Sequence, residues 1–211
     1  MKARGVLVLA GGESRRLKVP CKALLDFGGK PLIARVVSQA LKVSSLIVVS
    51  LAKNASLEAF QEVLPSGVEL VKDRFEGLGP LEGFRHGMRR LGELGAEYAL
   101  ALACDLPFLN AEALGFMLGE AEKLKAEALI PRWPNGFTEA LHSVYQPEPM
   151  SKASSEALNA GQHLIMDAVK RLKRVFYLDV DGLRRFDPQL LTLTNINTRQ
   201  DLEEALAKLK G

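Results

Sequence analysis

Apolar side chains along this chain are grouped in two ways, as short unbroken runs and as longer segments with helical spacing. Three of the short runs, Gly5–Leu9, Leu46–Ser50 and Tyr98–Ala103, are almost continuously apolar. Such runs are typical of parallel strands buried on both faces, because a strand with one face in water alternates apolar and polar residues. Residues 31–41 instead place apolar side chains every three or four positions behind Pro31, which suits the first turn of a helix.

Strand and helix patterns alternate up to about residue 127, and this order predicts an α/β fold. We expect a three-layer, Rossmann-like architecture in which a mostly parallel central sheet has helices on both faces. Further helices are predicted at residues 56–64, 80–91, 110–123, 149–159, 163–172 and 198–209, the last capped by Thr198 with Asp201 in its first turn. Further strands are predicted at residues 68–71, 128–131, 139–145, 175–178 and 190–194.

Composition and charge limit the class of protein. The apolar fraction of 47% over 211 residues supports a core without disulfides or a structural metal, and the two cysteines, Cys21 and Cys104, give no disulfide framework. The net charge of +3 is too balanced to indicate a nucleic-acid or membrane partner, although it permits an anionic small-molecule substrate. No apolar run approaches the roughly 20 residues that cross a bilayer. We therefore predict a cytoplasmic protein.

The segment Leu9–Leu17 is the strongest candidate for a binding site. Gly11 and Gly12 follow the first buried strand, at the edge of the sheet where backbone N–H groups point outward and anions collect. Donors and positive charge follow at Ser14, Arg15, Arg16, Lys18 and Lys22. The alternative is an ordinary strand-to-helix turn with solvated basic residues, but three basic residues and a serine within five positions favour an anion site.

Two familiar phosphate motifs are excluded. A P-loop requires lysine and then serine or threonine after its last glycine, whereas Lys30 is followed by Pro31. The glycines of residues 77–83 have the wrong spacing for a dinucleotide fingerprint, with Pro80 among them.

Two carboxylates are placed to serve the same sheet edge. Asp105 directly follows the third buried strand, and a carboxylate there requires a cation or a metal ion as partner, unless it only caps a helix before Pro107. Asp73 follows another strand, where a solvated turn residue is an equal alternative. His86 is expected on a helix, where a packing role is favoured over catalysis. His142 could contact the acceptor or be structural, and residues 132–136 could cover the substrate or form a surface turn.

Taken in order, these segments resemble the molybdenum cofactor guanylyltransferase family. Leu9–Leu17 and Lys22 are similar to the family's L-A-G-G-x-S-x-R-M-G-x-D-K signature, although Lys22 comes one position later and Lys18 replaces the glycine. Matching segments follow at residues 28–33 (G-x-P-L), 73–87 (D-x-x-x-G-x-G-P-L-x-G-x-x-x-G), 104–107 (C-D-x-P), 139–145 (E-P-L-H-A-V-Y) and 195–202 (N-I-N-T-P-E-D-L, with Arg199 in place of proline).

The resemblance implies a role for each matching position. The backbone of Leu9, Ala10, Gly11 and Gly12 would contact guanine. Arg16 and Lys22 would hold the phosphates and act in catalysis, and Asp73 would contact the nucleotide. The resemblance assigns Mg²⁺ to Asp105, which is thus both a catalytic and a metal-binding residue. Asn195 and Asn197 would lie near the molybdopterin side and the metal.

The implied activity is that of an Mg²⁺-dependent nucleotidyltransferase, which transfers GMP from GTP to the phosphate of molybdopterin and releases pyrophosphate. The implied fold is the nucleotidyltransferase version of the three-layer architecture, as one domain over residues 1–211, with a nucleotide-binding part at about 1–127 and an acceptor-binding part at about 128–211. Partner proteins would be transient, either other cofactor-biosynthesis proteins or apo-molybdoenzymes. The alternatives are a molybdopterin cytidylyltransferase, a cobinamide-phosphate guanylyltransferase, a sugar-phosphate nucleotidyltransferase or a non-catalytic nucleotide-binding protein.

Overall fold

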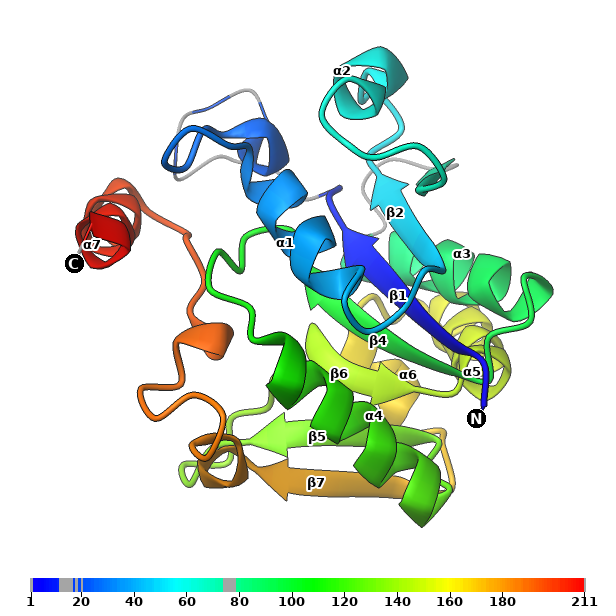
Figure 1. The fold of residues 1–211 in the computed structure, drawn as a ribbon. Helices are drawn as coiled ribbons and strands as arrows, with labels where there is room; N and C mark the ends of the chain where they lie inside the picture. The colour runs from blue at the N-terminus through cyan, green and yellow to red at the C-terminus, as the bar shows by residue number, and fades with distance from the viewer. Residues whose placement is uncertain (1, 12–16, 18, 20, 74–78, 211) are drawn as a thin grey trace.

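A computed structural model describes residues 2–210 of the chain, except for 12–16, 18, 20 and 74–78. In the described residues, seven strands form one sheet in the order β3-β2-β1-β4-β6-β5-β7 (Figure 1). Only β6 runs antiparallel to its neighbours. The strands are β1 (Arg4–Leu9), β2 (Ile47–Leu51), β3 (Glu69–Lys72), β4 (Tyr98–Ala103), β5 (Ala128–Arg132), β6 (His142–Tyr145) and β7 (Val175–Asp179).

Helices cover both faces of this sheet (Figure 1). The apolar sides of α1 (Leu32–Ala40), α2 (Leu57–Gln61) and α4 (Ala111–Leu124) share one core with one face of the sheet. The opposite face packs against α3 (Pro80–Glu93), α5 (Pro147–Asn159) and α6 (Ile165–Val169). The three-layer prediction is confirmed, because strands buried on both faces require a helix layer on each side.

The ends of these helices follow from local chemistry. Asn110 caps α4, because its side-chain oxygen accepts a hydrogen bond from the N–H of Ala113 at 3.0 Å. Helix α4 ends at Leu124, because the next residue, Lys125, has a φ of 50° in the left-handed region. At the start of α3, Gly79 has a φ of 69° and Pro80 occupies the first turn, so the chain turns sharply into the helix.

The strand register brings distant segments to one edge of the sheet. Leu9 is level with Ser50 on one side and with Ala103 on the other. The chains that leave β1 and β4 remain joined beyond the strands, since the N–H of Cys104 donates to the carbonyl of Leu9 at 3.1 Å. Strand β6 runs in the opposite direction and therefore begins at the edge where β1, β4 and β5 end.

Three predicted elements differ from the structure. Residues 190–194 form the 3-10 turn η3 (Leu191–Leu193) and no strand, because Leu190 adopts a φ of 54° and Asp187 accepts a hydrogen bond from the N–H of Thr192 at 2.7 Å. The strand predicted at 139–145 begins only at His142, whose N–H closes a turn on the carbonyl of Glu139 at 3.1 Å. The helix predicted at 163–172 is limited to α6.

The C-terminal segment returns to the N-terminal half of the molecule. After η2 (Val180–Leu183) and η3 it passes the edge of the sheet and ends in α7 (Arg199–Lys210) (Figure 1). Ile196 and Ala205 pack against Phe27 and Leu32 in a small separate apolar cluster. In the described residues, no helix has the length and apolar character required to cross a membrane.

Candidate active site

Asp105 lies two positions beyond the last residue of β4 and is 8% exposed. One oxygen of its carboxylate, Oδ2, pairs with the ammonium group of Lys22. The other, Oδ1, is buried and has no hydrogen-bond partner among the described residues. A buried carboxylate oxygen is costly without a donor or a cation, so this atom indicates where a ligand can bind.

Lys22 connects Asp105 to the C-terminal segment. It is the first residue of η1 (Lys22–Leu24), and its Nζ also donates to Oδ1 of Asn197 at 2.9 Å. The same segment is fixed to the strand end by the N–H of Ile196, which donates to the carbonyl of Asp105 at 3.1 Å. Three residues singled out in the sequence, Lys22, Asp105 and Asn197, therefore meet although they are far apart along the chain.

Asn195 has a different role from Asn197. Its side-chain amide donates to the carbonyl of Leu193 at 3.4 Å and so stays within its own turn. Asn197 is held from the opposite side, because its N–H donates to Oδ2 of Asp201 at 2.7 Å. The carboxylate of Asp201 thus fixes the backbone of the residue that contacts Lys22.

Asp73 lies one position beyond β3, close to the first glycine loop. Ser50 donates to its Oδ1 at 3.3 Å. A Cβ added to Gly11 would lie 3.3 Å from Oδ2 of Asp73, and one added to Gly83 would lie 2.7 Å from Oδ1. Burial raises the pKa of Asp73 to about 6; the Ser50 hydrogen bond opposes this rise, and the nearby charge of Glu82 adds to it.

Sequence reasoning missed Ser50 and Gly83. The available signals were a lone hydroxyl in the apolar run of β2 and a glycine in the first turn of a helix.

The remaining candidates of the glycine loop are only partly described. Leu9, Ala10 and Gly11 lie at the end of β1, where the N–H of Ala10 donates to the carbonyl of Ser50 at 2.8 Å. Gly12 and Arg16 lie outside the described residues, as do Ser14, Arg15 and Lys18.

The two histidines singled out in the sequence are both buried. His86 is on α3, where its Nε2 lies 3.5 Å from Oε1 of Glu82. His142 is the first residue of β6, and burial lowers its pKa to about 4. Neither ring nitrogen of His142 has a hydrogen-bond partner among the described residues. Its imidazole is therefore neutral at neutral pH.

Comparison with known proteins identifies the family. Residues 6–176 match the model of the MobA-like NTP transferase domain. The chain belongs to this family. A probable molybdenum cofactor guanylyltransferase of Methanosarcina mazei is 33% identical over 98% of this chain and 92% of the relative. The molybdenum cofactor guanylyltransferase of Desulfosudis oleivorans is 31% identical over 97% of this chain and 95% of its own.

Solved structures agree with this assignment. Molybdopterin-guanine dinucleotide biosynthesis protein A from Archaeoglobus fulgidus matches with a TM-score of 0.79 and 28% identity, over 98% of both chains. A 2-C-methyl-D-erythritol 4-phosphate cytidylyltransferase from Thermus thermophilus, at 17% identity and a TM-score of 0.68 over all of both chains, shares the fold. The predicted nucleotidyltransferase fold is thus confirmed, and as a member of the MobA-like NTP transferase family the chain is a nucleotidyltransferase.

The donor set of this MobA-like transferase fits one class of metal ion. In the described residues, no group of three or more histidine, cysteine or acidic side chains gathers as a zinc centre would require. Asp105 offers one carboxylate with an unpartnered oxygen, and Asn197 offers an amide oxygen beside it. Mg²⁺ is commonly held by one or two carboxylates together with substrate phosphates and water. The residues at the end of β4 therefore fit Mg²⁺ bound together with a triphosphate.

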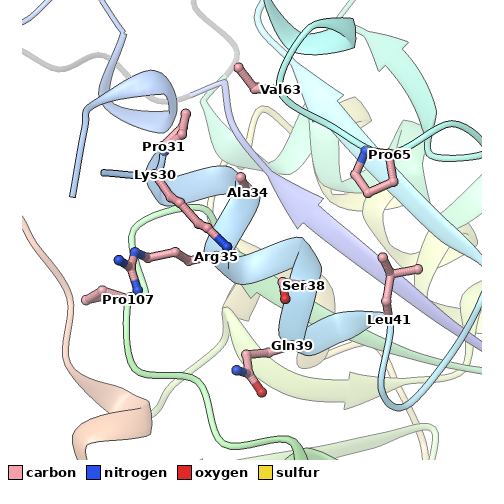
Figure 2. Close-up of a pocket in the computed structure, with 10 residues that line it drawn as sticks. All are labelled: Lys30, Pro31, Ala34, Arg35, Ser38, Gln39, Leu41, Val63, Pro65 and Pro107. Atoms are coloured by element: carbon pink, nitrogen blue, oxygen red, sulfur yellow. The ribbon is translucent and has the colours of Figure 1, made fainter. Parts of the chain in front are cut away.

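A separate pocket of about 530 Å³ lies on the outer side of α1 (Figure 2). It is lined by Lys30, Pro31, Ala34, Arg35, Ser38, Gln39, Leu41, Val63, Pro65 and Pro107. The guanidinium group of Arg35 donates to the carbonyls of Phe27 and Gly28, at 2.8 and 3.0 Å, and thereby fixes the preceding turn. The charged groups of the candidate active site are not among its lining residues, and we assign this pocket no part in the chemistry.

Proposed function

We propose that this chain transfers GMP from GTP to the terminal phosphate of molybdopterin and releases pyrophosphate. The names of the relatives support this reaction, and the relatives match the chain over nearly its full length. The observation that carries the proposal is the meeting of Lys22, Asp105 and Asn197 at the carboxyl edge of the sheet. In open α/β sheets, ligands bind at this edge.

The chemistry required of the chain is positioning and neutralisation of charge. A phosphate oxygen of the acceptor forms a bond to the α-phosphorus of GTP, and the bond from that phosphorus to the bridging oxygen of the β-phosphate breaks. The acceptor phosphate is already anionic at neutral pH, so no strong general base is needed. Electrostatic stabilisation of the charge that develops is then the main contribution of the protein.

Asp105 and Lys22 divide this task. When bound, Mg²⁺ neutralises phosphate oxygens and orients the triphosphate. Asp105 would hold the ion through its carboxylate, with the amide oxygen of Asn197 close by. The ammonium group of Lys22 then exchanges the carboxylate of Asp105 for phosphate oxygens. Gly11 and Asp73 would bind the nucleoside on the β1–β3 side of the sheet. Of the glycine-loop residues outside the described part of the chain, Gly12 would contact guanine through its backbone and Arg16 would hold phosphates.

The decisive experiment measures release of pyrophosphate from GTP, CTP and ATP with molybdopterin supplied, with and without Mg²⁺. We expect release with GTP and only with Mg²⁺. Asp105→Asn should lower kcat by at least about 100-fold while the protein still folds, because the variant keeps the shape but loses the charge that holds the ion. Asp181→Asn, which removes an exposed carboxylate of η2, is the matched control. Near-normal turnover in Asp105→Asn would contradict the metal assignment, and preference for CTP would contradict the assignment of GTP.

We further propose that the enzyme acts in the cytoplasm, with small molecules as its main partners. Transient contact with other cofactor-biosynthesis proteins or with apo-molybdoenzymes would pass the product on. The balanced net charge of +3 supports the absence of a nucleic-acid or membrane partner.

A further inference from the structure

The turn between β5 and β6 is an ordered structure at the same edge of the sheet as Asp105. The N–H of Trp133 donates to the carbonyl of Phe137, and the N–H of Gly136 donates to the carbonyl of Trp133, both at 2.8 Å. Asn135 accepts a further hydrogen bond from the N–H of Phe137 at 3.0 Å. These bonds present the ring of Phe137 to solvent at 61% exposure. A large exposed apolar side chain in a well-braced turn at the ligand edge suits contact with a substrate.

Glu139 follows this turn and has a firmly held backbone. Its N–H donates to the carbonyl of Pro131 at 3.0 Å. Its own carbonyl accepts hydrogen bonds from the N–H of His142 at 3.1 Å and from the hydroxyl of Ser143 at 2.6 Å. Two residues farther on, Leu141 accepts a hydrogen bond from the N–H of Ala103 at the end of β4, at 3.2 Å. Glu139 is therefore fixed beside the strand that carries Asp105.

Only one of the two carboxylate oxygens of Glu139 accepts a hydrogen bond from the described part of the chain. The indole N–H of Trp133 donates to its Oε1 at 2.7 Å. Within the described part of the chain, Glu139 has no ion pair and its Oε2 has no hydrogen-bond partner. Burial raises the pKa of this carboxyl, and the indole hydrogen bond opposes that rise. A half-buried carboxylate with one oxygen oriented and the other available is suited to bind donors from a ligand.

Sheet topology assigns Glu139 to the acceptor side of the site. Gly11 and Asp73 lie on the β1–β3 half of the sheet, Asp105 follows the central strand β4, and Glu139 lies between β5 and β6 on the opposite half. A triphosphate that spans from Gly11 to Asp105 leaves the β5–β6 half to the second substrate. The group bound by Glu139 is therefore part of the molecule that attacks the α-phosphate.

Resting on the proposed function, we propose that the carboxylate of Glu139 binds the amidine edge of the pterin ring of the acceptor, with Phe137 against the ring face and Trp133 as a positioning residue. This edge presents an N–H and an NH₂ group side by side, and the two oxygens of one carboxylate match such a donor pair. An aromatic side chain packs well on a flat heterocycle. Guanine carries the same edge, so the test must separate the two rings.

Trp133 is the only tryptophan of the chain, and its fluorescence therefore reports directly on this turn. The wild-type protein is titrated with 6-hydroxymethylpterin and, separately, with GTP and Mg²⁺. We expect saturable quenching by the pterin and no displacement of the pterin by GTP. Glu139→Gln should raise the Kd for the pterin by about 10- to 100-fold, because its amide offers one acceptor and one mismatched donor. Phe137→Ala, at an exposed position, should also weaken binding by several-fold.

Glu148→Gln is the matched control, since it removes an exposed glutamate from the first turn of α5 at the opposite edge of the sheet. It should leave the Kd for the pterin unchanged. An unchanged Kd in Glu139→Gln, or displacement of the pterin by GTP, would overturn the proposal. In the second case the turn binds guanine.

Steady-state kinetics separate this inference from the proposed function. Glu139→Gln should raise KM for molybdopterin by about 10- to 100-fold and leave KM for GTP unchanged. Trp133→Phe should raise KM for molybdopterin without lowering kcat, as expected of a positioning residue. Normal KM for molybdopterin in Glu139→Gln would overturn the inference while GMP transfer stands. Absence of GMP transfer, together with pterin binding that depends on Glu139, would support the inference and reject the proposed reaction.

Discussion

Lys22 and Asp105 neutralise each other at the end of β4, where both side chains are largely removed from solvent. Such a pair gains little over the solvated ions, because desolvation offsets most of the Coulomb attraction. A triphosphate with a cation offers each group a new partner of opposite charge at the same place. The ion pair is therefore well suited to exchange partners when the nucleotide binds, while Lys22 keeps its contact with Asn197.

The buried position of His142 lowers the free energy of unfolding of the protein at acidic pH. Burial lowers its pKa to about 4 in the fold, while the unfolded chain has the ordinary value of 6.5. Between these values the unfolded state binds the additional proton, so the free energy of unfolding falls as the pH falls from about 6.5 to 4. The loss over this window is on the order of 3 kcal/mol.

We therefore predict that His142→Leu removes this acid-dependent loss. The variant should be at least as stable as the wild type at pH 7, because two buried nitrogens that have no partner in the described structure are replaced by an apolar side chain. Its advantage should grow between pH 7 and pH 4.5, as measured by urea unfolding at each pH. His163→Gln, which removes an exposed histidine, serves as the control. A difference between wild type and His142→Leu that does not change with pH would contradict the prediction.

At the scale of elements, the N-terminal cap of α7 also supports the candidate site. Thr198 and Asp201 form the capping arrangement that the sequence predicts, since Asp201 accepts from the N–H of Thr198 at 2.8 Å and its own N–H donates to the Thr198 hydroxyl at 3.1 Å. The same carboxylate also accepts from the N–H of Asn197. The cap of α7 is thus directly linked to a contact of Lys22.

Asp201→Ala should accordingly affect both stability and turnover. Loss of the cap should cost about 1 kcal/mol in the free energy of unfolding. A displaced Asn197 should lower kcat by about 10- to 100-fold, because transfer depends on precise placement of charge. Ser56→Ala removes the cap of α2, where Ser56 accepts from the N–H of Ala59, and should affect stability alone. Equal losses of kcat in the two variants, measured below the unfolding transition, would show that the effect on turnover is not specific to Asn197.

The central elements could be predicted from the sequence because their pattern is dictated by burial. The apolar runs of β1, β2 and β4 indicate strands covered on both faces, and Asp105, just after such a run, indicates the candidate site. The strand predicted at residues 190–194 was wrong because an apolar run is compatible with either a strand or a buried turn. Their conformation depends on Asp187, whose side chain binds the N–H of Thr192, and a pattern of hydrophobicity does not contain that contact.

At the scale of the whole molecule, the segment that follows β1 and the C-terminal segment meet at the edge that carries the candidate site. Lys22 and Asn197 are 175 positions apart, and no local pattern could predict that they touch. Apolar packing fixes the approach, since Phe27 and Leu32 share a cluster with Ile196 and Ala205. The strand order also places Gly11 and Asp73 on one side of β4 and Glu139 on the other, which is the basis of the proposed division between nucleotide and acceptor.

The contact between the segment after β1 and the C-terminal segment predicts that nucleotide binding slows amide hydrogen exchange in both segments together. The N–H of Ile196 donates to the carbonyl of Asp105, so opening of the C-terminal segment exposes the carboxylate that would hold Mg²⁺. GTP with Mg²⁺ should therefore slow exchange in residues 190–198 and 21–27 together, by up to about 100-fold at a ligand concentration of 100 Kd.

The experiment compares short exchange times with and without GTP and Mg²⁺ in the wild type and in Asp105→Asn. Helix α5 is the internal control, because it follows β6 at the opposite edge of the sheet and should not respond at these times. The protection should weaken in both segments of Asp105→Asn, since Asp105 would hold the cation that accompanies the triphosphate and its backbone carbonyl accepts from the N–H of Ile196. Protection confined to the neighbourhood of Gly11 and Asp73 would mean that the nucleotide binds without engaging the C-terminal segment. The contact between residues 21–27 and 190–198 would then be purely structural.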